Sequence, residues 1–337
     1  MAITTSIAHT YNGIEMLELF MDPVIRTEDF TQYRIMPNVV GKVNIYFRGE
    51  ANKLVRKHSG TCNSTEKGSI VITDKTIETC KNDFFFGECF TTFDDIAHER
   101  EWVKFGSAAG DLTGTEVQRI MEGLIVDGLK RDIPRQIWFS KEGAANEDFD
   151  FCDGWFKIML DGSGTLDNLV DMSDFETGSA LNTDAGLDIF EKLIKERQAH
   201  FRSVPKSQLR FYVSSGIVEN YKQTLRDTST EFAQSVRVDG IEFPAFDGIP
   251  IIEQVYWETE IADATNEVVT DEFTTGSNSA VVLSFAENFI IGLDSLNATR
   301  GQDALIGYDL KDDKVYARGK FELGMQVFHH EWVAVVR

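Results

Sequence analysis

The sequence is short of cysteine, of basic residues and of long apolar runs, and each shortage excludes a class of protein. Its four cysteines, Cys62, Cys80, Cys89 and Cys152, include no C-x-x-C pair, which argues against a zinc site. No apolar run approaches the roughly 18 residues that a membrane span needs, and the N-terminus lacks the basic and apolar segments of a secretory signal. We therefore expect free thiols and no membrane partner, with a Cys80–Cys89 bridge left open.

Basic residues are outnumbered, 33 against 55 acidic ones, so the net charge is −22. A simple nucleic-acid-binding protein needs a basic face that displaces counterions, and this composition argues against one. The charge is unevenly distributed: residues 1–58 have a net charge of +1, whereas residues 139–279 hold 11 basic and 27 acidic residues. The central part is therefore either a solvated acidic domain or the acidic side of a molecule whose two sides differ in charge.

The clearest helix is predicted over residues 113–133. Thr113 and Glu116 form a capping box, in which each side chain satisfies a free N–H group of the first turn. Pro134 is expected to end the helix. Gly123 and Gly128 weaken it by about 1 kcal/mol each relative to alanine, and they either permit close packing or mark a bend. A second helix is predicted to begin at residue 183 or 184 and to end near 203, before a proline.

The stretch from Lys206 to Glu253 organises the chain as a strand, a capped helix, a loop and a second strand. Residues 209–213 alternate apolar with polar or amphipathic side chains, which predicts a half-buried strand. Ser214 or Ser215 is expected to cap the next helix, whose apolar face is Ile217, Tyr221 and Leu225. Pro250 lies in the second apolar run, 246–252, and predicts an edge strand or a strand that begins after it.

The pattern of apolar and polar residues predicts strands or loops for other segments of the chain. Residues 1–40 are predicted to form an extended arm with one short helix and scattered apolar residues, and a strand is predicted from Val39 to Phe47. The adjacent phenylalanines 84–86 are a core cluster if the domain stands alone. The acidic residues 258–279 are expected to form a loop. Further strands are predicted at 70–72, 280–283, 289–291, 315–317, 321–327 and 332–336.

The order "FYVSSGIVENY…L" followed by "FDGIPIIE" resembles the axial domain of tailed-phage major capsid proteins with the Hong Kong 97-type fold. The arrangement "IW…FDF.DGW" resembles a subgroup of these proteins in which a strand leads to the helix that opens the axial domain, and this resemblance implies a strand at 137–139. The segment "ENFIIGLD" followed by "ARGKFELGMQVFHHEWVAVV" resembles the end of their peripheral domain. The resemblance covers most of the chain, and it is carried by the order of the segments rather than by one motif.

This resemblance implies an α+β, Hong Kong 97-like fold whose parts follow one another along the chain. The implied parts are an N-terminal arm (1–40), a strand and extended β loop (41–105), a peripheral domain with a long spine helix (106–138), an axial domain (139–279) and a return to the peripheral domain (280–337). The last strands are expected to pair with those that flank the spine helix. The phenylalanines 84–86 would then contact a neighbouring subunit.

No group of residues supports an active site. None of the six histidines has ligand spacing, and His329 and His330 are expected to point to opposite faces of a strand in a structural role. Asp148, Asp150 and Asp153 are spaced like the start of a calcium loop, but Met159 stands where the closing acidic residue is needed. No phosphate loop, nucleophile elbow or dinucleotide fingerprint occurs. We predict no catalytic, cofactor-binding or metal-binding residues, no cofactor and no enzymatic activity.

The resemblance implies a major capsid protein that self-assembles into hexamers and pentamers of an icosahedral phage head around double-stranded DNA. Its expected partners are copies of itself, a portal, scaffold or decoration proteins, and packaged DNA through weak, non-specific contacts. Its expected location is the virion, after assembly in the host cytoplasm. An encapsulin-type nanocompartment shell protein and a soluble acidic enzyme remain the alternatives.

Overall fold

The computed structural model describes residues 7–11, 21, 32–48, 72–89, 116–160, 169–178, 180–196, 202, 204–227, 235–238, 241–273, 278–293, 304–309, 312 and 314–337. Helices and strands are both extensive and are organised around two sheets, so the predicted α+β class is confirmed. Among the described helices, none has both the length and the apolarity to cross a membrane.

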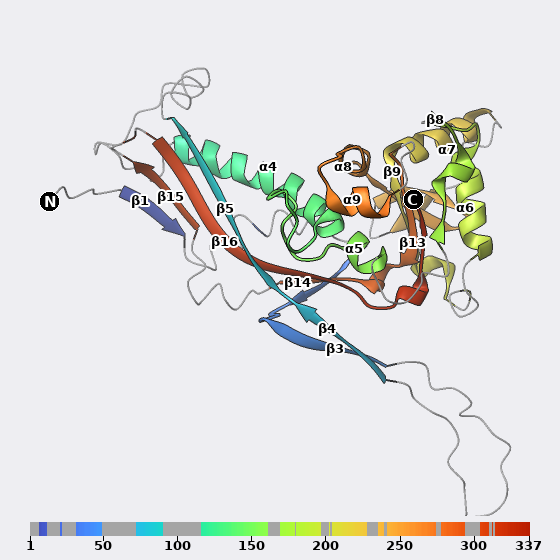
Figure 1. Cartoon of the computed structure of the whole chain (residues 1–337), viewed down its shortest axis with the longest axis horizontal. Helices are drawn as coiled ribbons and strands as arrows, with labels where there is room; N and C mark the ends of the chain where they lie inside the picture. Colours follow the sequence, from blue (N-terminus) through green and yellow to red (C-terminus); the bar gives the residue numbers. More distant parts are fainter. Residues whose placement is uncertain are drawn as a thin grey trace, which may run out of the picture.

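A six-stranded sheet lies at one end of the molecule (Figure 1). Its strands in spatial order are β1 (Ile7–Tyr11), β15 (Ala304–Asp309), β16 (Lys314–Val327), β14 (Phe289–Leu293) and β2 (Arg34–Pro37), with β5 (Cys80–Cys89) also paired to β16. The strand β16 is long enough to pair with β5 along one edge and with β15 and then β14 along the other. The separately predicted strands 315–317 and 321–327 are therefore one strand.

The helix α4 (Glu116–Phe139) runs beside this sheet (Figure 1). The prediction that Pro134 ends it is wrong, and so is the strand predicted at 137–139, because the helix continues through both. Its buried side chains recur every four residues past the proline, at Met121, Ile125, Leu129, Ile133 and Ile137. Burial of this stripe outweighs the hydrogen bond lost at Pro134. The capping residue Thr113 lies outside the described residues.

A seven-stranded sheet forms the other end of the molecule. Its spatial order is β10 (Ser235–Val238), β11 (Ile241–Phe246), β12 (Ile249–Gln254), β9 (Leu209–Ser214), β13 (Val281–Phe285), β17 (Val333–Val336) and β6 (Leu169–Val170). The helices α6 (Ala185–Glu196) and α7 (Ser215–Asp227) pack against one face. A short hairpin of β7 (Glu176–Thr177) and β8 (Ala180–Leu181) precedes α6.

The predicted strand at 209–213 and the helix after it are present, but β9 is buried on both faces rather than half-buried. Phe211 packs with the helices α6 and α7, while Tyr212 joins the apolar cluster on the opposite face of the sheet. The edge position predicted from Pro250 is also wrong. The strand β12 lies between β9 and β11, and its ladder with β9 begins at Ile251, so the missing N–H of the proline removes no bond from that ladder.

The strands of residues 280–337 divide between the two sheets. We predicted that this segment returns to the peripheral domain, yet β13 pairs with β9, and β17 pairs with β13 and β6. Only β14, β15 and β16 lie in the six-stranded sheet. The physical reason is that β13 and β17 are apolar on both faces, which suits interior strands of a sheet that is covered on both sides.

Three short helices fill the space between the sheets. They are α5 (Trp155–Leu160), α8 (Trp257–Ile261) and α9 (Glu267–Glu272). The last two lie in the segment predicted as a loop, so that prediction is wrong. The side chain of Asn266 caps α9 by accepting from the N–H groups of Val268 and Val269, and both valines are buried.

Aromatic side chains from both sheets meet around Trp138, in the last turn of α4. The rings of Trp155 and Trp257 lie 4.8 Å and 4.7 Å from it, Phe289 of β14 lies at 5.3 Å, and Tyr212 of β9 at 5.7 Å, all between ring centroids. Trp138 itself is 2% exposed. This aromatic junction joins the two sheets into one apolar core.

Two of the cysteines are joined, which corrects the expectation of free thiols. Cys80, at the start of β5, forms a disulfide with Cys152, in the segment between α4 and α5. Cys89 is free and exposed, so the Cys80–Cys89 bridge that the sequence left open does not form. Cys62 lies outside the described residues. The bridge ties the six-stranded sheet to the chain that leaves the end of α4.

Candidate assembly surfaces

A two-stranded hairpin projects from the body of the molecule (Figure 1). The strands β3 (Lys42–Arg48) and β4 (Ile72–Glu78) pair antiparallel over their whole length. Tyr46 is 67% exposed on it, and the ion pair between Lys42 and Glu78 is open to solvent. An isolated hairpin of two strands is marginally stable in water. Because few elements of the same chain pack against this hairpin, its exposed surface is suited to contact with another molecule.

The hairpin occupies only part of the predicted extended loop, 41–105. Its described strands span residues 42–78, and the next strand, β5, lies in the six-stranded sheet. The phenylalanines 84–86 are therefore not on the hairpin. Phe84 and Phe86 pack against the core, whereas Phe85 points the other way and is 71% exposed. The prediction that the cluster is core holds for two of the three side chains.

An apolar cavity of about 350 Å³ lies between β5 and α4. Its lining residues are Phe84, Phe85, Phe86, Leu124, Ile125, Gly128, Leu129 and Asp132. Phe85 and Leu124, at 71% and 47% exposed, are among the most exposed large apolar side chains of the described chain. With a single carboxylate among its lining residues, the cavity offers little to orient a polar small molecule.

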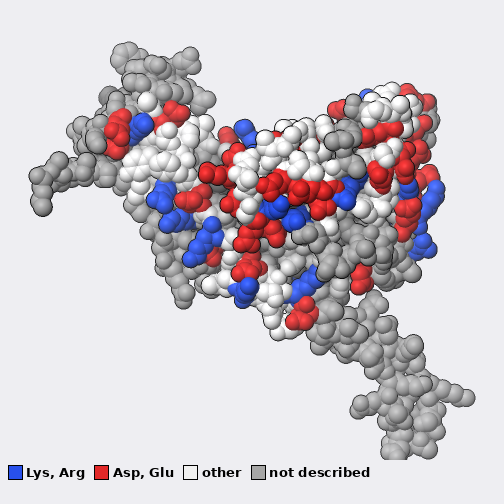
Figure 2. All heavy atoms as spheres, viewed as in Figure 1, with Lys and Arg blue, Asp and Glu red and all other residues white. Residues whose placement is uncertain are grey.

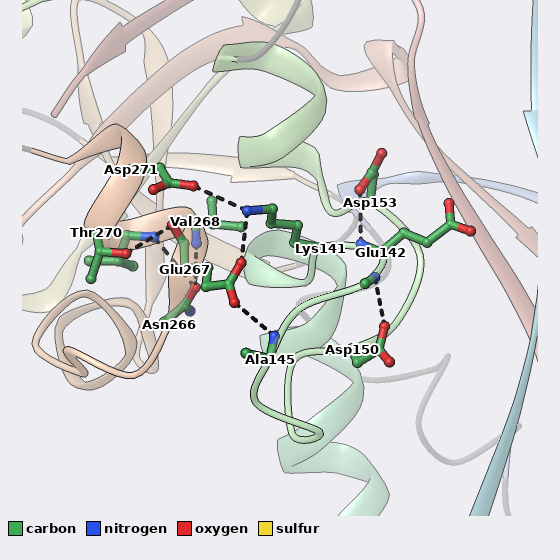
Figure 3. A network of polar contacts seen from close by, with 12 residues as sticks. Lys141, Glu142, Ala145, Asp150, Asp153, Asn266, Glu267, Val268, Thr270 and Asp271 are labelled. Atoms are coloured by element: carbon green, nitrogen blue, oxygen red, sulfur yellow. Dashed lines mark hydrogen bonds and ion pairs between the residues drawn. The ribbon is translucent and has the colours of Figure 1, made fainter.

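A polar network joins the segment after α4 to α9 (Figure 3). The ammonium of Lys141 bridges two carboxylates, Glu267 at 2.8 Å and Asp271 at 3.1 Å, and the N–H of Ala145 donates to Glu267 over 2.7 Å. The hydrogen bonds to Glu267 and Asp271 raise the pKa of Lys141, and the hydrogen bond from Lys141 lowers the pKa of Glu267. Both shifts favour the charged forms of Lys141 and Glu267, and the network fixes this segment against the acidic helix.

The aspartates that are spaced like the start of a calcium loop take part in hydrogen bonds within the segment after α4. Asp150 accepts from the N–H of Gly143 over 2.8 Å, and Asp153 accepts from the N–H of Glu142 over 3.0 Å (Figure 3). The N–H of Asp148 donates to the side chain of a neighbouring asparagine. The carboxylates therefore stabilise turns. Within the described ranges, no three His, Cys, Asp or Glu side chains are grouped as metal ligands would be.

Glu260 of α8 is buried beside Arg135 of α4, with 3.9 Å between Oε1 and Nε. Burial raises the pKa of Glu260, nearby carboxylates add to this, and the charge of Arg135 opposes it. A carboxyl whose pKa is higher in the folded state than in the unfolded state binds more protons when folded. Stability is then fully present below the ordinary pKa of 4.5 and falls as the pH rises through the folded-state pKa.

We therefore expect Glu260→Gln to raise the free energy of unfolding at neutral pH and to leave it unchanged below pH 4.5. The amide keeps the shape of the carboxyl and removes the buried charge. Urea unfolding at a series of pH values between these limits measures the effect. The control is Glu147→Gln at an exposed position, which should change stability by no more than about 0.5 kcal/mol. A variant that is less stable at every pH would contradict the expectation.

No protein-family model and no curated protein matches this chain. Solved structures do match it over almost their whole length. A chain of the satellite phage P4 procapsid that includes the size determination protein is 12% identical, with a TM-score of 0.57 over 96% of this chain and 90% of that one. The capsid of an empty GTA particle is 11% identical, with a TM-score of 0.51 over 91% and 87%. A chain of Mycobacterium phage Ogopogo is 10% identical, with a TM-score of 0.50 over 92% and 91%.

This chain has the phage major capsid protein fold. The Hong Kong 97-like architecture expected from the sequence is thereby confirmed at the level of the fold. The candidate assembly surfaces of the described chain are the projecting hairpin, the apolar cavity beside α4 and the outer face of the polar network.

Acidic side chains gather across the middle of one face of the molecule (Figure 2). Exposed members of the segment after α4 and of α9 include Glu142, Glu147, Asp150, Asp153 and Asp271. The acidic charge that the sequence places in residues 139–279 is thus partly concentrated on one surface. Which side of a shell this surface would face stays a prediction.

The two adjacent histidines do not lie in a strand, and their structural role stays a prediction. His329 lies in the short link after β16, and its N–H donates to the side-chain oxygen of Asn288 over 2.7 Å. Its ring packs against Trp332 in a tilted arrangement, with 4.3 Å between centroids. His330 begins a short 3-10 helix. Burial lowers the pKa of His330, and Lys75 adds to this. The side chains of the other four histidines lie outside the described residues.

Proposed function

We propose that this chain is the major capsid protein of a tailed phage. The observation that carries the proposal is the match of nearly the whole chain, 96%, to 90% of a procapsid chain with a TM-score of 0.57. In this proposal the six-stranded sheet with α4 is the peripheral domain, and the seven-stranded sheet with α6 and α7 is the axial domain. Subunits form hexamers and pentamers that close into an icosahedral head around double-stranded DNA.

The physical role of such a chain is mechanical, and no enzymatic activity is proposed. A closed symmetric shell uses the same surfaces many times, so modest apolar and polar patches on each subunit are multiplied by symmetry. A stable contact between subunits buries about 1,200–2,000 Å² in total. The hairpin of β3 and β4 and the cavity beside α4 are the surfaces that we assign to such contacts. Portal, scaffold or decoration proteins and packaged DNA are the further partners, at the virion and, during assembly, in the host cytoplasm.

The experiment that tests the proposal is sedimentation velocity and negative-stain microscopy of the protein expressed alone. We expect closed particles, or rings of five and six subunits that close when a scaffold is added. A monomer that stays monomeric at high concentration, with and without candidate scaffolds, would overturn the shell function and favour a soluble acidic protein. The contents of the particles then distinguish a phage head from an encapsulin-type nanocompartment. A phage head takes up double-stranded DNA, whereas a nanocompartment holds protein cargo.

A further inference from the structure

The two strands of the projecting hairpin leave the six-stranded sheet at adjacent points. On one side, the chain turns out of β2 after the N–H of Val39 donates to the carbonyl of Leu293, over 3.0 Å. On the other side, it turns at Thr79, between β4 and β5. The two turns are bonded to each other, because the N–H of Thr79 donates to the carbonyl of Gly41 over 3.0 Å, and the N–H of Gly41 donates to the Thr79 hydroxyl over 3.2 Å.

A pair of glycines lies directly beneath these turns. Gly292 of β14 and Gly324 of β16 are opposite each other in the sheet. A Cβ on Gly324 would lie 2.2 Å from the backbone oxygen of Glu78, and a Cβ on Gly292 would lie 2.8 Å from Cδ1 of Ile77. Real Cβ atoms essentially never approach other atoms closer than 3.0 Å. A side chain at either glycine would therefore clash with β4, because this strand crosses the sheet directly over the glycine pair.

Other contacts hold the hairpin along the end of β16. Ile77 is fully buried in a small cluster with Val39, Ile290 and Phe328. The ammonium of Lys75 donates to the carbonyl of Val327 over 2.8 Å. The side-chain amide of Gln326 donates to the carbonyl of Thr76 over 2.7 Å. Lys75 and Ile77 lie on the same face of β4, and the third contact uses the backbone of this strand, so together they hold β4 against the sheet.

We propose that the glycine pair Gly292–Gly324 sets the direction in which the hairpin of β3 and β4 leaves the body, and that this direction decides whether a subunit can join its neighbours. The part of this proposal that concerns assembly with neighbouring subunits rests on the proposed shell function. Gly324 is the stricter member, because the atom it would meet is backbone, whereas Gly292 would meet the end of a flexible side chain.

The test measures the hairpin direction and assembly separately. In a chain with Cys62→Ser and Cys89→Ser, spin labels are placed at Asp74→Cys on β4 and Glu219→Cys on α7, both exposed positions. Labelled chains are diluted with unlabelled ones, so that double electron–electron resonance reports distances within one chain. We expect Gly324→Ala to shift or broaden the distance distribution and to abolish closed particles, with an unchanged circular dichroism spectrum.

The matched control is Gly123→Ala in α4, where the added methyl group meets nothing within 4 Å. It should change neither the distance distribution nor the assembly. An unchanged distance in Gly324→Ala would overturn the proposal, and so would a shifted distance with normal particles. If the unmodified chain forms no particles under any condition, the proposed function fails, while the distance measurement still decides what the glycines do.

A second variant keeps the proposal testable if Gly324→Ala does not fold. Gly292→Ala should shift the same distance, and Ile77→Val in the same chain should restore it, because the valine lacks the Cδ1 atom that the new methyl group would meet. A residual contact with Val39 at 3.2 Å is small enough for a side chain to adjust. Failure of Ile77→Val to restore both the distance and the particles would count against the proposal.

Discussion

Replacement of Trp138 with alanine should remove about 3–5 kcal/mol from the free energy of unfolding, as buried aromatic truncations do. Trp138 is 2% exposed, and its ring contacts rings from α5, α8, β9 and β14. These elements cannot collapse into the space left by the indole without moving one sheet relative to the other. Folded domains have about 5–15 kcal/mol of stability in total, so the variant should retain little soluble folded protein.

The measurement is urea unfolding followed by far-ultraviolet circular dichroism, with Trp138→Phe as an intermediate case. Phe85→Ala is the matched control, because Phe85 is a large aromatic residue that is 71% exposed. Its effect on stability should stay within about 0.5 kcal/mol, as for other surface substitutions. Equal unfolding midpoints for Trp138→Ala and Phe85→Ala would show that the aromatic junction does not hold the two sheets together.

The sequence around Trp138 shows which local signal predicts the end of α4 correctly. The resemblance to a capsid-protein subgroup implies a strand at 137–139, and Pro134 is expected to end the helix before it, yet α4 continues to Phe139. The buried stripe of α4 continues through Ile133 and Ile137 at unchanged spacing. Helical periodicity was therefore present on both sides of the proline, and it was the better guide to the structure. A proline lowers helix stability locally, and tertiary burial of the flanking turns overrides that effect.

Strand order and exposure were harder to predict than the strands themselves. Most of the predicted strands lie near observed ones, yet the sequence predicts that β9 is half-buried and that β12 is an edge strand or begins after Pro250. The first expectation treats the sheet as covered on one face, whereas the second rests on the missing N–H of Pro250. Local alternation cannot reveal that α6 and α7 cover one face while the aromatic junction covers the other, because these elements come from distant parts of the chain.

The remaining features depend on residues that are far apart in the sequence. Lys141 meets Glu267, and Gly292 faces Gly324, through the fold alone. No local spacing signals such pairs. The helix α9 was missed for a related reason, since it is only six residues long and is defined by the Asn266 cap and by burial rather than by a repeating pattern.

The disulfide between Cys80 and Cys152 gives the second large expected effect. It links residues 72 positions apart in the chain, and this loop contains most of β5 and all of α4. Closure of a loop of this length restricts the unfolded chain and contributes about 4 kcal/mol to stability in the chain-entropy model. Reduction of the protein should therefore lower the urea midpoint strongly, and the double variant Cys80→Ala with Cys152→Ala should reproduce the loss without reductant.

Cys89→Ser is the control for this experiment, because Cys89 is free and exposed. It should leave the midpoint unchanged, and it should leave the sensitivity to reductant intact. Mass spectrometry after thiol alkylation under denaturing conditions identifies which cysteines are bonded. Identical midpoints for oxidised and reduced protein would contradict the expected stabilisation. Because Cys80 directly follows the turn at Thr79, a bridge that does stabilise the chain also anchors the point from which the hairpin departs.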